Sequence, residues 1–358
     1  MTNKKAFTYI ILFSLILLCS CGQSISENEA RRDDFSSYQE LKRTYRTHEE
    51  DLFMGRPQLI HLIEDKLAIY DIYDENYILW LTKDFKALDR NFHKGTGPGE
   101  FSTALRLYPS EDGKLLTVCE YGRDVVKTYN MQDAINGRLT HPVRVDSVHV
   151  NGGVATPMGD KYVIPDVRGD MKMFSLQDRQ GNEVLRFGDY PGKINSPDQT
   201  DDLYLFMLIQ NLVAVNPERN VVVGAGRQSD LLCFYQIGEN GEATLLNQYH
   251  TYDPDVDIKM FENGASMDYN DKTMIAYQSL CPTKSYLFAS YIGIKEGERK
   301  KKRYSYLQVF DWEGNFIKGY KLDAPLTDMA IDEENRTVYG LWGGAEPHIR
   351  TYKLEGLN

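Results

Sequence analysis

A weak internal repeat recurs roughly every 45 to 65 residues from about Leu52 to the C-terminus. Each copy contains a short strand, an acidic or glycine-containing turn, two further strands and a hairpin that carries glycine. Repeats of this length built from four strands are typical of β-propellers. The repeat therefore predicts the architecture, and it also predicts which loops lie on the same face of the molecule.

The second strand of each copy is the clearest, because it is a β-branched or aromatic run of strand length. These runs lie at Lys66–Asp71, Lys114–Glu120, Lys161–Asp166, 220–225, 285–290 and 336–341. Third strands are predicted at Tyr77–Leu81, Val125–Tyr129, Met171–Leu176, Leu231–Ile237, Ser305–Phe310 and His348–Lys353. Glycine and asparagine at 177–183 and 310–316 favour the tight hairpins that lead into fourth strands.

The copies number six, and the sixth ends after its third strand at Lys353. We expect the missing strand to come from the N-terminal side, around Leu41–Phe53, because this closes the ring and removes two free sheet edges. The sequence thus predicts an all-β, six-bladed propeller over residues 41–358 with four-stranded antiparallel blades, with five or seven blades as alternatives. Helical periodicity is confined to the N-terminus and to Asp201–Ile209.

The first residues have the features of a secretory signal peptide. Lys4 and Lys5 precede the apolar run Ala6–Leu18, which is shorter than the roughly 20 residues of a membrane span. The following Leu18-Cys19-Ser20-Cys21 resembles a bacterial lipobox, with Cys21 as the acylated residue. We therefore expect a signal peptide over residues 1–20, a lipidated polar tether over 21–40 and an outer-membrane location, facing the periplasm or the surface. An ordinary cleaved signal is the alternative.

Residues 67–101 resemble one blade of the NHL and TolB-like six-bladed propellers. The likeness is strongest in the glycine-rich segment Asn91–Phe101, which is similar to the inter-blade segment of those repeats. With the leader, the chain resembles six-bladed propeller lipoproteins of Bacteroidetes over about residues 40–358. Many such proteins have no assigned activity, so the resemblance implies a fold more than a function.

Composition limits the class of partner. Removal of residues 1–20 leaves 39 basic against 52 acidic residues, a net charge of −13. An acidic chain of this kind argues against nucleic acid as a partner. Cys119, Cys233 and Cys281 show no zinc-site spacing. Cys119 and Cys233 lie inside predicted strands and are expected to be buried apolar residues, with one disulfide among the three as the alternative.

Three long insertions are predicted to lie on one face. In a propeller the loops between blades emerge on the same side as the loops joining strands two and three. Asp189–Asp202 joins blades three and four, Thr251–Asn270 joins blades four and five, and Ile292–Arg303 joins strands two and three of blade five. The segment Gly95–Phe101 shares that face. Long loops that cluster are usually functional.

Residue types in these insertions are those of recognition surfaces. The aromatic residues are Tyr190, Tyr204, Phe206, Tyr252, Phe261 and Tyr269, and the basic residues include Arg299, Lys301 and Arg303. Asp253, Asp255 and Asp257 are expected opposite this basic run. We interpret the face as a binding site for a protein, peptide or glycan. The alternative is that the aromatic residues cover their own blades and the charges are solvated.

Candidates for catalysis or metal binding are weaker. Asp71, Glu120 and Asp166 end matching second strands and could hold a cation such as calcium around the central channel, although acids there more often cap their own turns. No nucleophile elbow, His-Glu-x-x-His or phosphate loop is present, and the histidines show no ligand spacing. A binding or scaffolding module without a cofactor is the first hypothesis, and a metal-dependent propeller hydrolase or lyase is the second.

Overall fold

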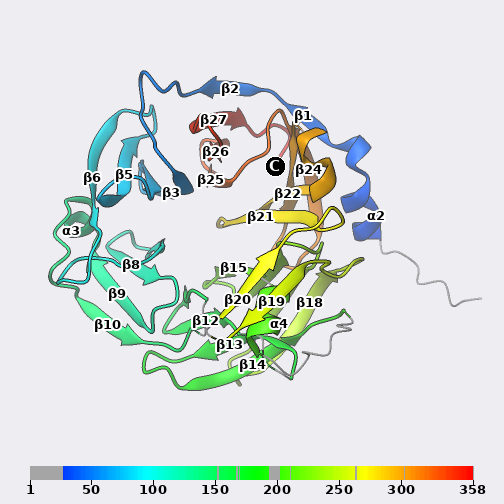
Figure 1. The fold of residues 1–358 in the computed structure, drawn as a ribbon, viewed down its shortest axis with the longest axis horizontal. Coiled ribbons are helices and arrows are strands. Elements are labelled where there is room, and N and C mark those ends of the chain that lie inside the picture. Colours follow the sequence, from blue (N-terminus) through cyan, green and yellow to red (C-terminus); the bar gives the residue numbers. More distant parts are fainter. Residues whose placement is uncertain are drawn as a thin grey trace, which may run out of the picture.

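The computed structural model describes residues 27–357, apart from 151–152, 167, 169, 193–201, 210, 263 and 302. Within these residues the chain forms a ring of six blades around a central axis (Figure 1). The first strands of several neighbouring blades contact one another, which places them around the axis. The six-bladed, all-β fold predicted from the sequence is confirmed, and the alternatives of five or seven blades are wrong.

Each of the first four blades is a continuous four-stranded antiparallel sheet. Blade one is β3 (Pro57–Ile63), β4 (Lys66–Asp71), β5 (Asn76–Thr82) and β6 (Ala87–His93). Blade two is β7 (Leu105–Pro109), β8 (Leu115–Glu120), β9 (Val125–Asn130) and β10 (Arg144–Ser147). Blade three is β11 (Thr156–Met158), β12 (Lys161–Pro165), β13 (Lys172–Gln177) and β14 (Glu183–Asp189). Blade four is β15 (Asn211–Asn216), β16 (Val221–Gly226), β17 (Leu232–Ile237) and β18 (Ala243–Tyr249).

The N-terminal segment completes the last two blades. Blade five is β21 (Met274–Pro282), β22 (Leu287–Lys295), β23 (Ser305–Phe310) and β24 (Phe316–Leu322), with β1 (Gln39–Leu41) added in parallel to β24. Blade six is β25 (Asp328–Asp332), β26 (Thr337–Trp342), β27 (His348–Lys353) and β2 (Arg43–Arg46), the last antiparallel to β27. The predicted N-terminal closing strand is therefore confirmed, and β1 is an additional edge strand that the sequence analysis did not anticipate.

The segment before β1 differs from the predicted polar tether. From Glu27 onward it forms α2 (Glu27–Asp33) and the short η1 (Phe35–Ser37), and α2 packs on β24 at the outer rim (Figure 1). Cys21 and the predicted signal peptide lie outside the described residues. Among the helices that the structure describes, none has the length and apolar character needed to cross a membrane.

Four segments between the strands contain regular structure beyond the blades. The helix α4 (Asp202–Ile209) matches the helical periodicity of that segment, and α3 (Met131–Ile135) follows β9. Between blades four and five the chain forms an extra hairpin of β19 (Asp257–Phe261) and β20 (Gly264–Asp268), which was expected to be a loop. The insertion of blade five contains the 3-10 helix η2 (Glu296–Lys301).

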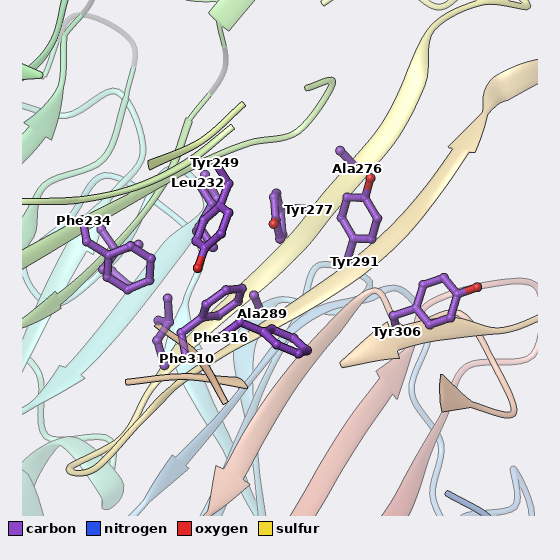
Figure 2. Close-up of a cluster of buried hydrophobic side chains, with 14 of the residues drawn as sticks. Leu232, Phe234, Tyr249, Ala276, Tyr277, Ala289, Tyr291, Tyr306, Phe310 and Phe316 are labelled. Carbon is purple, nitrogen blue, oxygen red and sulfur yellow. The ribbon is translucent and has the colours of Figure 1, made fainter. Parts of the chain in front are cut away.

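Each interface between adjacent blades contains its own hydrophobic cluster. Between blades four and five, for example, the ring centroids of Phe234 and Phe310 lie 5.8 Å apart. Figure 2 shows both side chains within this cluster. A second strand such as β16 contributes to two clusters, with Val222 on the side of blade three and Val223 on the side of blade five. Because both faces of these strands are buried, they have the nearly continuous apolar sequences from which the repeat was identified.

The glycine-rich segment between blades one and two folds back on itself. Lys94 and Phe101 form a parallel bridge, and the Gly95 amide donates to the carbonyl of Phe101 at 3.0 Å. Phe92 and Phe101 are buried, with ring centroids 5.2 Å apart. The segment thus connects the outer strand of blade one to the inner strand of blade two, as the family resemblance implies.

Candidate binding face

The long insertions meet on the face that the propeller topology predicts for them. The helix α4 packs against both strands of the β19–β20 hairpin. The Glu296 amide of η2 donates to the carbonyl of Thr273 at 2.8 Å, and the Thr273 hydroxyl donates to the carbonyl of Asp255 at 2.5 Å. We call the described parts of residues 189–209, 251–273 and 292–303 the loop assembly. It is one connected structure over blades three to five.

Two of the predicted aromatic residues stabilise the loop assembly from within. Tyr190 is buried, and its hydroxyl donates to Asp253 Oδ1 at 2.9 Å. The same carboxylate oxygen lies 3.0 Å from His250 Nε2. The hydroxyl of Tyr252 lies 3.2 Å from that of Tyr291 on β22. These contacts attach the insertions to blades three to five.

The remaining predicted aromatic residues are half-buried or exposed. Tyr204 and Phe206 on α4 are half-buried, and Tyr204 packs on the core between blades three and four. Phe261 at the tip of the β19–β20 hairpin is 60% exposed. Tyr269 is 44% exposed, and its hydroxyl accepts a hydrogen bond from Gln228 at 2.7 Å. In the predicted aromatic set, Tyr190 is therefore buried, Phe261 and Tyr269 are exposed, and the other three are half-buried.

The basic residues of the insertion in blade five are exposed. Arg299, Lys300 and Lys301 lie in η2, and Arg303 follows it. Arg299 forms an ion pair with Glu296 at 3.5 Å. Asp255 accepts a hydrogen bond from Asn270 at 3.2 Å. Arg299 thus pairs within its own helix, rather than with the aspartates expected opposite it.

Further exposed aromatic residues lie on the same face but were not singled out from the sequence. Phe53 precedes blade one, and Tyr73 and Tyr121 lie in the loops after the second strands of blades one and two. They are 51%, 65% and 48% exposed, and the rings of Phe53 and Tyr73 are 5.4 Å apart. The sequence could have identified Tyr73 and Tyr121, because they closely follow the acids that end β4 and β8.

The strand-end acids bind neighbouring backbone or basic groups. Asp71 accepts the amides of Gly55 at 3.0 Å and Arg56 at 2.7 Å. Glu120 accepts the Ser102 amide at 2.8 Å. Asp166 forms an ion pair with Arg168 at 2.6 Å.

These acids do not converge on a common point in the structure. Across the described residues, no group of three histidine, cysteine, aspartate or glutamate side chains is arranged to hold a metal ion. Cys119, Cys233 and Cys281 are free thiols. Burial raises the pKa of the Cys233 and Cys281 thiols to about 12, so both are protonated at neutral pH.

Two basic side chains beside inner strands of the ring were missed by the sequence analysis. Arg106 on β7 and Arg227 after β16 interact electrostatically with each other, although they come from blades two and four. Desolvation and Arg106 lower the pKa of Arg227. Desolvation and Arg106 also lower the pKa of His61 on β3 to about 3, so this imidazole is neutral. Arg106 was missed because Leu-Arg-Leu-Tyr reads as an ordinary strand whose polar side faces solvent.

Comparison with known proteins agrees with this architecture. Two crystal structures from Bacteroides are similar: a member of the DUF4221 family from Bacteroides vulgatus and a putative exported protein from Bacteroides fragilis. The first has a TM-score of 0.54 and 11% identity, covering 88% of this chain and 97% of the other. The second has a TM-score of 0.52 and 13% identity, covering 87% and 94%. No curated protein matches the sequence. The model of the TolB-like 6-blade propeller-like family matches residues 34–334, and the chain belongs to this family.

Proposed function

We propose that this chain is an exported, lipid-anchored binding or scaffolding module of the cell envelope, which recognises a protein, peptide or glycan through the loop assembly. The observation that carries the proposal is that insertions from three places in the sequence form one connected structure on a single face. Isolated long loops are tolerated at little cost in closure entropy, but a packed assembly of them is typical of a functional surface.

The accessible residues of the loop assembly suit recognition. Phe261 offers an exposed ring at the hairpin tip, and Arg299, Lys301 and Arg303 offer exposed positive charge elsewhere on the loop assembly of an otherwise acidic chain. None of these four side chains contributes to the cores between the blades. Aromatic and arginine side chains are enriched at binding surfaces.

The proposed location rests on sequence and on one relative. The basic and apolar leader followed by Leu18-Cys19-Ser20-Cys21 favours export and acylation at Cys21. The similar structure from Bacteroides fragilis is described as a putative exported protein. Metabolic labelling with a fatty-acid analogue tests acylation at Cys21. We expect the wild-type protein to be labelled and the Cys21→Ala variant to lose the label.

The binding face is tested with full-length variants folded to the same extent. In one, residues 257–268 are replaced by a short Gly-Asn turn, and in another Arg299, Lys301 and Arg303 are each changed to Glu. Partners recovered with the wild type from envelope extracts, or bound on a glycan array, should be lost with both. Leu88→Ala on β6, 49% exposed on an outer blade edge, is the matched control and should bind normally. Unchanged binding by both loop variants would refute the site.

The alternative of a metal-dependent enzyme makes a different prediction. Since Asp71, Glu120 and Asp166 are not grouped to hold a metal ion, we expect calcium to leave the stability unchanged, whereas a cation that binds only the native state would raise it. Thermal unfolding measured with chelator and with added calcium separates the two functions. A calcium-dependent rise in the melting temperature that disappears in Asp71→Asn would favour the enzyme, whereas a lower melting temperature alone would reflect the lost hydrogen bonds to Gly55 and Arg56.

A further inference from the structure

A cavity of about 410 Å³ opens between the closing strand of blade six and the loop before its third strand. It is lined by residues 46–50, at and after the end of β2, and by residues 346–348, which lead into β27. Both segments lie on the face that carries the loop assembly, because one connects blade six to blade one and the other joins strands two and three. The volume falls in the range of roughly 300 to 1,000 Å³ that is typical of ligand sites.

The lining of the cavity is acidic and only partly paired. It contains the glutamates Glu49, Glu50 and Glu346 and one arginine, Arg46, whose Nη2 lies 3.4 Å from Glu346 Oε2. The side chain of Glu346 is 80% exposed. Across the described residues, the carboxylates of Glu49 and Glu50 form no ion pair and accept no hydrogen bond. The cavity therefore carries uncompensated negative charge, which is complementary to a cationic group.

The internal repeat relates this cavity to a site in blade four. Glu346 lies two residues before β27, and Asp230 lies two residues before β17, the third strand of its own blade. The rings correspond as well. Tyr249 pairs with Leu232 at the start of β17, and His48 reaches the start of β27 two residues beyond the last paired residue of β2. Each blade thus places one carboxylate and one ring at the same position of the repeat.

In blade four this position binds an arginine from outside the ring. The guanidinium of Arg32 in α2 lies 3.1 Å from Asp230 Oδ2 and 4.7 Å from the centre of the Tyr249 ring. Only 2% of the Arg32 side chain and 3% of the Asp230 side chain are exposed, so the position is filled. A carboxylate and a ring hold a guanidinium by a charge-assisted hydrogen bond and a cation–π contact. The cavity of blade six offers the same two groups to solvent.

We propose that this cavity binds the arginine side chain of a protein or peptide partner, in the way that blade four binds Arg32. The guanidinium pairs with Glu346 and stacks on the ring of His48, and Glu49 and Glu50 add negative charge around it. An arginine within a chain fits better than a free ion, because the cavity opens to solvent and admits a side chain while the partner backbone stays outside.

The bound arginine is held more weakly than the one in blade four. Arg46 already contacts Glu346, and Glu346 is far more exposed than Asp230, so solvent screens the new ion pair. The site lies over blade six, whereas the loop assembly lies over blades three to five. It therefore adds a second contact point on the same face and a chemical requirement for the partner, an accessible arginine.

Three short alanine peptides with blocked ends test the site on the full-length chain. They carry arginine, lysine or citrulline at the centre, and citrulline keeps the shape of arginine without its charge. The NMR signals of the His48 ring report binding directly. We expect saturable shifts with the arginine peptide, about threefold weaker binding of the lysine peptide, and no shift with the citrulline peptide.

Exposed glutamates provide matched variants. Glu346→Gln should lower the affinity for the arginine peptide at least fivefold, and the combined change of Glu49, Glu50 and Glu346 to Gln should abolish binding. Glu334→Gln is the control, because Glu334 is an exposed glutamate of the same blade that lies in the turn between β25 and β26. None of these side chains is buried, so the melting temperatures should stay unchanged, and a loss of binding is then not a loss of fold.

The loop assembly is controlled separately. The variant with residues 257–268 replaced should still bind the arginine peptide, so the two proposals can fail independently. The site is refuted if the His48 signals do not move, if the lysine or citrulline peptide binds as tightly as the arginine peptide, or if the triple glutamine variant keeps wild-type affinity.

Discussion

Arg32 shows how a single buried charge can attach the N-terminal segment to the ring. Its guanidinium forms ion pairs with Asp33 at 2.7 Å and Asp230 at 3.1 Å, and it lies 4.7 Å from the centre of the Tyr249 ring. Its carbonyl accepts the hydroxyl of Tyr38 at 2.5 Å. Because Asp230 belongs to blade four and α2 packs on blade five, Arg32 connects the segment to both blades.

Replacement of this arginine should be strongly destabilising. Arg32→Met leaves Asp230 as a buried carboxylate without its cationic partner, and breaking a buried ion pair in this way costs about 3 to 5 kcal/mol. Asp230 keeps its hydrogen bonds from the amides of Thr251 and Tyr252, so the lower end is expected. Denaturant unfolding measures the change. Arg31→Met, at an exposed neighbour, should change the free energy of unfolding by less than about 0.5 kcal/mol.

His61 predicts a pH dependence of stability. Its pKa is about 3 in the folded chain and about 6.5 when unfolded, so the unfolded state binds the proton first as the pH falls. Stability is therefore lost below pH 6.5, by about 1 to 2 kcal/mol at pH 5. Denaturant unfolding at several pH values should show a smaller loss in His61→Gln. In NMR titrations Arg106→Gln should raise the pKa of His61, and an unchanged pKa would contradict the electrostatic effect of Arg106 on this imidazole.

At the scale of elements, the hairpin turns that lead into fourth strands also fix the packing between blades. Gly314 lies in such a turn in blade five with φ +85°, and an added Cβ would lie 2.6 Å from Asn247 Cβ and 2.9 Å from Phe234 Cδ2 in blade four. The Gly314 carbonyl also accepts hydrogen bonds from Asn247 and Tyr249 at 2.9 and 2.8 Å. The turn thus serves as an inter-blade contact.

A matched pair of glycine substitutions separates the two roles of this turn. Gly241 occupies the equivalent turn of blade four with φ +79°, but no atom lies within 4 Å of an added Cβ. Gly241→Ala should cost only the backbone strain, about 1 kcal/mol. Gly314→Ala carries the same strain and also a steric clash, so we expect about 2 to 4 kcal/mol. Denaturant unfolding measures both changes. Equal losses in the free energy of unfolding for the two variants would show that the clash at Gly314 is relieved without cost.

The elements that could be predicted from the sequence are those buried on both sides. β4 and β16 have continuous apolar sequences because each contributes to two blade interfaces. The β19–β20 hairpin was missed because neither strand has a buried position, and both pack on α4 instead of a blade. β1 was missed because three residues, Gln39–Leu41, carry too little pattern to identify a strand.

For the whole molecule, closure of the ring depends on contacts between its first and last blades. Lys83, in the turn after β5, forms an ion pair with Asp332 at the end of β25 at 2.6 Å, and the side chain of Asp332 is only 4% exposed. Desolvation alone would raise the pKa of Asp332, but hydrogen bonds from Lys83 and Asn335 lower it overall. The carboxylate is therefore more stable in the closed ring than in the unfolded chain.

This pair makes closure sensitive to acid. The stabilisation is present above the unfolded pKa of Asp332, near 4, and is lost as the pH falls through the lower folded value. Lys83→Met should lower the free energy of unfolding at pH 7 by about 1 kcal/mol and make its decline below pH 4 less steep. Denaturant unfolding at pH 7 and pH 3 measures both effects. Lys86→Met, in the same turn but paired with exposed Asp84, is the control and should behave like the wild type.

Functional sites were harder to predict than the ring itself. The topology placed the insertions on one face, because loop positions follow directly from strand order. It could not show that Tyr190 and Tyr252 turn inward while Phe261 stays exposed, since this depends on contacts between separate insertions. Nor could the topology identify Arg106, because its electrostatic interactions are with groups from three other blades.

The position of α2 determines how an anchored propeller could be held. The helix lies at the rim of blade five and not over either end of the channel (Figure 1). A lipid on Cys21, as proposed, would be separated from Glu27 by six residues, a reach of at most about 20 Å. The ring would then contact the bilayer at its rim, with its axis parallel to the membrane plane. Both ends of the central channel would face the surrounding solvent.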